Sequence, residues 1–216
     1  MPFDGLFTYC MVNELKEKIM GGRIMKIHQP YPNEIILSIR SKGTNHKLLL
    51  SAHPTYARAQ LTRETYANPP EPPMFCMILR KHLEGFFIEL IEQKDCDRII
   101  IFKVKGRDEL GDESYKLLII EIMGRHSNII LVDQVKGTII DCIKHISPAV
   151  NRYRSILPGQ SYIWPPEQNK MNPFSATEED VIRLLDYNAG KLDRQLVEQF
   201  AGISPVFAKE VLIQCG

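Results

Sequence analysis

The 216-residue sequence has no excess of charge of either sign. Its 27 lysines and arginines are matched by 26 aspartates and glutamates, and its formal net charge is +1. A nucleic-acid partner must therefore be held by a local patch of cations and not by the charge of the whole chain. The apolar fraction of 44% and the charged fraction of 25% are ordinary for a globular protein. The length allows one large domain or two small ones.

The sequence also lacks signs of export, membrane insertion and metal binding. Its five cysteines have no C-x-x-C spacing and do not cluster with histidine, so we expect no metal and no cofactor. The odd cysteine count and the lack of a signal peptide favour a reducing, cytoplasmic setting. No apolar run reaches membrane-spanning length. Helical sequence runs up to Gly216, and we expect a fragment of a longer protein.

Sequence motifs of enzymes are missing as well. No glycine-rich phosphate loop precedes a helix, which disfavours an NTPase. There is no local pair of acids for acid–base catalysis and no serine or cysteine in the context of an activated nucleophile. We therefore assign no catalytic residue, and the sequence favours binding over catalysis.

The hydrophobic periodicity predicts an α+β fold. Antiparallel strands in two groups, each preceded by a helix, indicate a two-sheet antiparallel β-sandwich with two helices. We expect helices over residues 4–20 and 73–84, a first group of strands at 23–29, 34–39 and 47–51, and a second group at 86–92, 98–105, 114–121, 128–133 and 138–143.

The composition divides the chain into three parts. Residues 1–147 form the predicted sandwich, and residues 148–174 form a proline-rich connecting or wrapping segment. Residues 175–216 predict a small helix–hairpin–helix domain that opens with Ser175 as N-cap. Its turn at Gly202 either offers backbone amides to a phosphate or is only a compact turn.

The most informative stretch joins two apolar runs and has the sequence Glu121-Ile122-Met123-Gly124-Arg125-His126-Ser127-Asn128. An arginine fork with a histidine and small polar side chains suits a phosphate or the edge of a nucleotide. The alternative is a polar hairpin turn with an ordinary ion pair between Glu121 and Arg125.

Two further charged sites lie at the ends of predicted elements. Asp97 and Arg98 begin a buried strand, and they neighbour the loop at 124–127 if the sheet brings both to one end. The alternative is a hairpin ion pair of little net stability. Arg80 and Lys81 lie in the last turn of the second helix, where they either bind a ligand or compensate the helix dipole.

Seven motifs occur together: MPFDG at 1–5, GGRI at 21–24, LLLSAHP at 48–54, EPPMFCM at 71–77, LRKHL at 79–83, DR at 97–98 and EIMGRHSN at 121–128. In combination they resemble the N-terminal part of the NFACT family, whose bacterial members are ribosome quality-control factors also described as fibronectin-binding proteins. The resemblance covers essentially the whole chain. The family fold looks like the N-terminal domain of formamidopyrimidine-DNA glycosylases.

The resemblance implies a non-enzymatic partner of RNA. Family members bind the large ribosomal subunit obstructed by peptidyl-tRNA and recruit alanyl-tRNA for tailing of the nascent chain without mRNA. Peptide transfer is then carried out by the ribosome. The residues matching the family's tRNA-handling motifs are Asp97, Arg98, Glu121, Ile122, Met123 and Arg125, to which the sequence adds His126. Possible further RNA contacts are Arg80, Lys81, Ser127 and Asn128.

Two alternatives remain open at this point. A DNA glycosylase could use the amine of Pro2 after methionine removal, although in those enzymes a glutamate follows, whereas here Phe3 follows and Asp4 comes one place late. A surface adhesin could bind fibronectin, although no secretion signal supports it.

Overall fold

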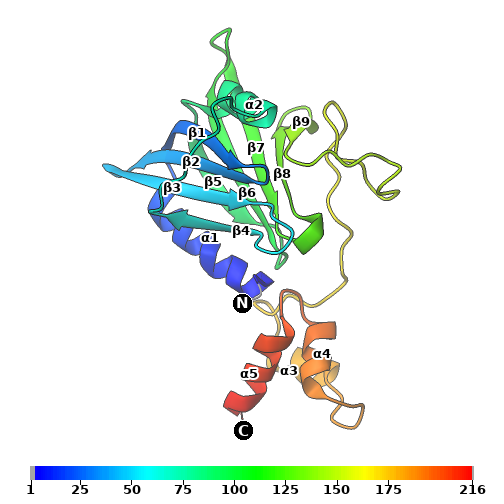
Figure 1. Cartoon of the computed structure of the whole chain (residues 1–216). Helices are drawn as coiled ribbons and strands as arrows, with labels where there is room; N and C mark the ends of the chain where they lie inside the picture. The colour runs from blue at the N-terminus through cyan, green and yellow to red at the C-terminus, as the bar shows by residue number, and fades with distance from the viewer. Residues whose placement is uncertain (1–2, 216) are drawn as a thin grey trace.

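The computed structural model describes residues 3–215 and contains one nine-stranded antiparallel sheet with five α-helices in that range (Figure 1). The strand order is β4-β3-β2-β1-β5-β6-β7-β8-β9. The strands are β1 (Arg23–Tyr31), β2 (Glu34–Ser41), β3 (Thr44–Ser51), β4 (Arg58–Thr62), β5 (Phe87–Gln93), β6 (Ile99–Arg107), β7 (Glu113–Glu121), β8 (Asn128–Asp133) and β9 (Thr138–Cys142). The α+β class is confirmed.

The expectation of two separate sheets is wrong. Strand β1 pairs with β5, and Arg23 of β1 lies opposite Phe87 of β5. Two backbone hydrogen bonds, from the Ile24 amide to the Phe86 carbonyl (2.8 Å) and from the Ile88 amide to the Gly22 carbonyl (2.9 Å), extend the junction. The strands therefore form two half-sheets, β1–β4 and β5–β9, that are continuous through one short seam.

A hydrophobic core fills the space between the two half-sheets. One cluster of buried side chains contains Ile27 and Leu48 from the first half-sheet and Phe102 from the second. Leu15 of α1 (Gly5–Ile19) and Leu79 of α2 (Met74–Leu83) belong to the same cluster. Figure 1 shows β1–β4 in front of the second half-sheet. The two layers expected of a sandwich thus exist, but as one sheet that turns back on itself.

Helix α1 follows the sequence prediction closely. The Asp4 carboxylate caps its N-terminus by accepting a hydrogen bond from the Phe7 amide at 2.8 Å. Leu15 and Ile19 lie four residues apart on the buried face. Gly21, at a φ of +78°, follows the helix in a conformation that glycine adopts readily.

Much of the proline-rich segment belongs to the packing of the sheet. The backbone of Ile156 exchanges hydrogen bonds with that of Ile146 at 2.8 and 2.9 Å. Tyr162 and Trp164 pack with Ile130 in a second cluster, on the outer face of the second half-sheet. Residues up to about 164 therefore wrap the sheet.

The C-terminal helices α3 (Glu178–Leu184), α4 (Leu192–Gln199) and α5 (Pro205–Cys215) surround a small core of Leu196, Phe200 and Ala208. Thr177, and not Ser175, is the N-cap of α3, since Thr177 and Asp180 form a reciprocal capping box. Within residues 3–215, no helix is both long enough and apolar enough to cross a membrane.

Candidate nucleic-acid interface

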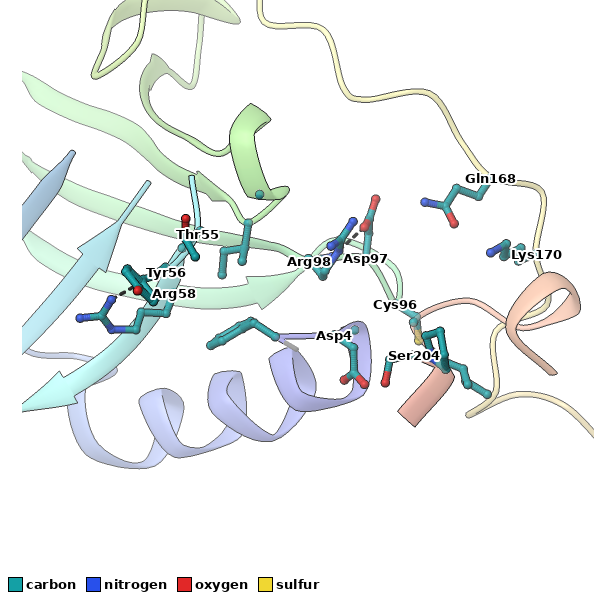
Figure 2. A pocket seen from close by; sticks show the side chains of 18 of the residues that line it. Asp4, Thr55, Tyr56, Arg58, Cys96, Asp97, Arg98, Gln168, Lys170 and Ser204 are labelled. Atoms are coloured by element: carbon teal, nitrogen blue, oxygen red, sulfur yellow. Dashed lines mark hydrogen bonds between the residues drawn. The ribbon is translucent and has the colours of Figure 1, made fainter. Parts of the chain in front are cut away.

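A cleft of about 1040 Å³ lies where several parts of the chain meet. Its lining comes from the β5–β6 turn, the loop after β7, the start of β4, the segment that leads to the helical hairpin, the start of α1, the start of β2 and the turn before α5. Figure 2 shows Asp97 and Arg98 between Tyr56 and Arg58 on one side and Lys170 on the other. Three cationic side chains from distant positions in the sequence therefore line one cleft.

Asp97 and Arg98 are held by a network of backbone hydrogen bonds. The Asp97 carboxylate accepts from the Arg98 amide at 2.7 Å, and the Asp97 carbonyl accepts from the Gln93 side chain at 2.9 Å. The Arg98 carbonyl accepts from the Ile122 amide at 2.8 Å. The backbone of this dipeptide is thus fixed by the sheet, and both side chains are half-buried.

The sheet register brings the two predicted motifs to the same end. Ile99 lies opposite Glu121, and Glu121 lies opposite Asn128. Ile122 and Gly124 line the same cleft as Arg98. The predicted juxtaposition of Asp97-Arg98 with this loop is confirmed.

Arg125 and His126 lie just outside the cleft. They belong to a 3₁₀ turn, η1 (Gly124–His126), that opens with Gly124 at a φ of +57°. Both side chains are exposed, and the Arg125 Nε donates to the His126 Nε2 at 3.0 Å. Arg125 thus places a further cation at the rim of the cleft.

Glu121 lies inside the protein and does not face the cleft. Its side chain is fully buried, and its two oxygens accept hydrogen bonds from the Arg154 guanidinium. The Tyr162 hydroxyl also donates to Glu121, at 2.7 Å. Burial and the neighbouring carboxylate raise the pKa of Tyr162, so its hydroxyl stays a donor. The ion pair with Arg125, which the sequence left open as an alternative, is not formed, because Glu121 pairs with Arg154 instead. The expected contact of the Glu121 side chain with tRNA is not possible in this conformation, because the side chain is fully buried.

Ser127 and Asn128 shape the loop from within. The Ser127 hydroxyl accepts from the Met123 amide at 2.8 Å. The Asn128 side chain donates to the Lys144 carbonyl at 2.8 Å and accepts from the Lys144 amide at 3.1 Å. Ile122 packs in the first core cluster, and Met123 packs against the second. These four residues position the loop, while Arg125 and His126 are its exposed side chains.

Arg80 and Lys81 lie away from the cleft, which contradicts their expected place in the same patch. The Arg80 Nε donates to the Ile27 carbonyl at 2.8 Å. Lys81 pairs with Glu109, in the β6–β7 turn, at 3.3 Å. The nine residues of β6 separate this turn from Arg98. The ion pair of Lys81 with Glu109 therefore lies roughly 25–30 Å from Arg98.

Sequence reasoning missed Tyr56, Arg58 and Lys170. Arg58 begins β4, a strand that is absent from the strands predicted above, and its guanidinium lies 3.7 Å from the Glu34 carboxylate. The Tyr56 ring is 64% exposed and stacks on His53 with centroids 5.0 Å apart. Lys170 donates to the Val197 carbonyl at 2.8 Å. No local motif marks any of them.

The helical hairpin docks by its carbonyl and not by its amides. The Gly202 carbonyl accepts from the amides of Gly5 (3.0 Å) and Leu6 (3.3 Å), which have no hydrogen-bond partner within α1 because they lie in its first turn. A Cβ at Gly202 would lie 2.7 Å from the Cys96 carbonyl oxygen. The sequence left open whether the turn at Gly202 offers its amides to a phosphate or is a compact turn. The structure shows a compact turn that packs on the start of α1.

One cluster of potential metal ligands occurs within residues 3–215, formed by Asp141, Cys142 and His145. The His145 Nε2 lies 2.7 Å from the Asp141 carboxylate. Burial raises the pKa of the Cys142 thiol to about 12, and the thiol donates to the carbonyls of Lys144 and Ile156. The thiol is thus hydrogen-bonded within the protein.

Comparison with known proteins identifies the family. The model of the NFACT N-terminal and middle domains matches residues 4–216. The chain belongs to the NFACT family. It is 58% identical over its whole length to the Bacillus subtilis protein named "Rqc2 homolog RqcH", of which it covers 38%. It is 32% identical to an archaeal Rqc2 homolog from Methanocaldococcus jannaschii, with 94% of the chain and 29% of the relative covered.

Solved structures of NFACT relatives share this fold. The N-terminal domain of the fibronectin-binding protein PavA from Streptococcus pneumoniae superposes with a TM-score of 0.93 at 43% identity, covering 99% of this chain and 80% of that one. The N-terminal part of a fibronectin/fibrinogen-binding protein from Streptococcus suis gives 0.92 at 47% identity, covering 97% and 78%. The chain spans about a third of the length of the curated relatives that it matches. Pro2, the residue on which the glycosylase alternative depends, lies outside the residues that the structure describes.

Proposed function

We propose that this chain is the tRNA- and large-ribosomal-subunit-binding module of a cytoplasmic ribosome quality-control factor. In this role it recruits alanyl-tRNA for mRNA-independent C-terminal tailing of stalled nascent chains. The module binds RNA and performs no chemistry of its own, because peptide transfer belongs to the ribosome. Its parts are a sheet domain over residues 1–147, the segment 148–174 and a helix–hairpin–helix domain over 175–216.

The observation that carries this proposal is the state of Arg98 in the cleft. Within residues 3–215, no carboxylate oxygen lies within 4.0 Å of a side-chain nitrogen of Arg98. Arg58 and Lys170 line the same cleft, and Arg125 lies beside it. The acids Asp4, Glu34 and Asp97 also line the cleft, but none of them pairs with Arg98. A planar guanidinium with free donors suits the phosphates and base edges of folded RNA. Binding should weaken steeply with salt.

The test is the recovery of tRNA with an Asp97→Ala/Arg98→Ala variant. We expect the variant to stay folded and to recover about tenfold less ribosome-bound tRNA, because its cleft loses the free guanidinium. The measurement is a pull-down of ribosomes followed by sequencing of the RNAs that co-purify with the protein.

The chain contains a matched control for this test. Asp193 and Arg194 form the same dipeptide on α4, and the Arg194 amide donates to the Asp193 carboxylate at 3.0 Å, as at the cleft. Asp193→Ala/Arg194→Ala should leave tRNA recovery unchanged. Equal recovery from a folded Asp97→Ala/Arg98→Ala protein and from the wild type would refute the proposed site.

Fibronectin binding is a second candidate because two similar solved structures carry that name. Capture of the chain on immobilised fibronectin at physiological salt tests it. Capture that survives Asp97→Ala/Arg98→Ala would assign fibronectin to another surface. A glycosylase activity of Pro2 is tested by borohydride trapping on abasic DNA, and no adduct is expected.

A further inference from the structure

A row of cationic and aromatic side chains crosses the outer face of the sheet. Arg40 of β2 lies opposite Arg23 of β1, which lies opposite Phe87 of β5. Phe87 lies opposite Lys105 of β6, and Lys105 lies opposite Tyr115 of β7. Directly paired residues of antiparallel strands point to the same face. The row spans five strands and crosses the seam between the half-sheets.

The pair Arg23–Arg40 is unfavourable for stability by itself. Like charges directly opposite each other on neighbouring strands destabilise a sheet. Within residues 3–215, neither guanidinium has a carboxylate oxygen within 4.0 Å. Arg40 donates to the Asn45 side chain at 3.1 Å, and Arg23 donates to the Gly85 carbonyl at 3.2 Å. These neutral partners leave the positive charge uncompensated, which an external anion would correct.

A neighbouring row widens the positive surface. Lys26 of β1 and Lys47 of β3 both lie opposite Ser38 of β2. Ser38 is two residues from Arg40, so this second row runs about 7 Å from the first. Neither lysine forms an ion pair within the described part of the chain.

The aromatic member of the row is open to solvent. Phe87 is 51% exposed, and the Arg23 guanidinium lies 6.0 Å from its ring centroid. Both line a hollow of about 730 Å³ on the seam. Glu84, Glu89 and Glu113 also line this hollow. Glu113 pairs with Lys105 at 3.0 Å and Glu84 lies 3.9 Å from Arg80, whereas Glu89 forms no ion pair within residues 3–215. The unpaired cations of the two rows lie on β1, β2 and β3.

We propose that this row is a second RNA-binding surface that takes a single-stranded segment. Arg23 and Arg40 hold consecutive phosphates, and an unpaired base stacks on Phe87. Exposed aromatics beside a basic track are the arrangement by which proteins hold single-stranded nucleic acid. The proposal rests on the proposed function in taking RNA as the partner. The site is separate, because Lys105 lies six residues along β6 from Ile99, roughly 20 Å from the cleft.

The experiment measures binding of a fluorescein-labelled oligouridylate of about twelve nucleotides by fluorescence anisotropy. For Arg23→Gln/Arg40→Gln, we expect about tenfold weaker binding at low salt. The slope of log K against log salt concentration should fall by about 1.4, because two phosphate contacts are lost. For Phe87→Ala, we expect about tenfold weaker binding with an unchanged slope, because only stacking is lost.

Two controls make the result decisive. Arg183→Gln/Arg194→Gln removes two exposed arginines of the helical domain and should leave binding unchanged. Thermal unfolding of each variant verifies that it folds. Unchanged affinity and slope in the folded Arg23→Gln/Arg40→Gln protein, or an equal loss in the control, would overturn the proposal. Asp97→Ala/Arg98→Ala should retain oligouridylate binding, so failure of the cleft and failure of the row give different results.

Discussion

The ion pair of Glu121 with Arg154 shows how a buried charge can position an exposed site. Both side chains are at most 8% exposed, and the Tyr162 hydroxyl satisfies a further acceptor site of the carboxylate. Such a pair is costly to desolvate and adds little net stability over apolar residues, but removing one partner leaves a charge buried alone. The pair fixes the end of β7 directly before Ile122 and the loop.

Arg154→Met is therefore expected to destabilise the protein strongly. It strands the Glu121 carboxylate in the core, and we expect the free energy of unfolding to fall by about 3–5 kcal/mol. Urea unfolding at neutral pH measures the change. Arg183→Met, which breaks an exposed pair with Asp180, should cost less than about 1 kcal/mol. Similar losses in the two variants would contradict a special role for the buried pair.

Glu121 also marks the limit of sequence reasoning for single residues. The types and the spacing of residues 121–128 correctly predicted a polar loop between two strands, because the flanking runs are apolar. The partner of Glu121 lies 33 residues away, in a proline-rich stretch with no regular pattern. Only the fold brings Arg154 to it, so the sequence offered only the nearer Arg125 as a possible partner.

Secondary structure was predictable wherever a local signal existed. Helix α1 has a capping aspartate, a periodic apolar face and a terminal glycine, and its predicted bounds differ from the observed ones by one residue at each end. Strand β4 has no clear alternation, and its side chains are mostly half-buried, so the sequence predicts no strand there. The β1–β5 seam contains one directly paired couple of residues, Arg23 and Phe87, and no sequence pattern indicates this pairing.

The junction between the sheet domain and the helical hairpin depends on close backbone approach. The Gly5 and Gly202 Cα atoms and the Cys96 carbonyl meet there without room for a side chain. Tyr9 and Phe174 add a ring contact with centroids 4.3 Å apart. The cleft that contains Arg98 depends on this junction, because its lining comes from both sides.

Gly202→Ala should weaken this junction. Its methyl group would lie 2.7 Å from the Cys96 carbonyl oxygen, and its φ of +75° disfavours alanine. Gly43→Ala is a matched control with a φ of +78° and open space around the Cβ. Both variants carry a backbone strain of about 1–2 kcal/mol. Only Gly202→Ala should show faster limited proteolysis in residues 165–175, measured by mass spectrometry; equal rates would show that the contact is not needed.

At the scale of the whole molecule, charge is balanced in total but uneven in place. The sequence predicted a local cationic patch from a net charge of +1, and Asp97-Arg98 does lie beside the loop after β7. The other cations of the cleft come from residues 58 and 170, which meet only through the complete fold. The positions of Arg80 and Lys81 could not be predicted from the sequence either. Both lie on α2, and only the fold shows that the end of this helix lies beside the β6–β7 turn and not beside Arg98.

The whole molecule should also lose stability in mild acid. Burial lowers the pKa of both His28 and His82 from 6.5, and the nearby cations Arg80 and Lys116 act in the same direction. As the pH falls through 6.5, these two histidines bind protons in the unfolded chain before they do so in the folded protein. The free energy of unfolding therefore decreases as the pH drops through 6.5. We expect His28→Gln/His82→Gln to flatten this dependence in urea unfolding between about pH 7.5 and 5.5. An equally steep loss of stability in the double variant would assign the acid sensitivity to other groups.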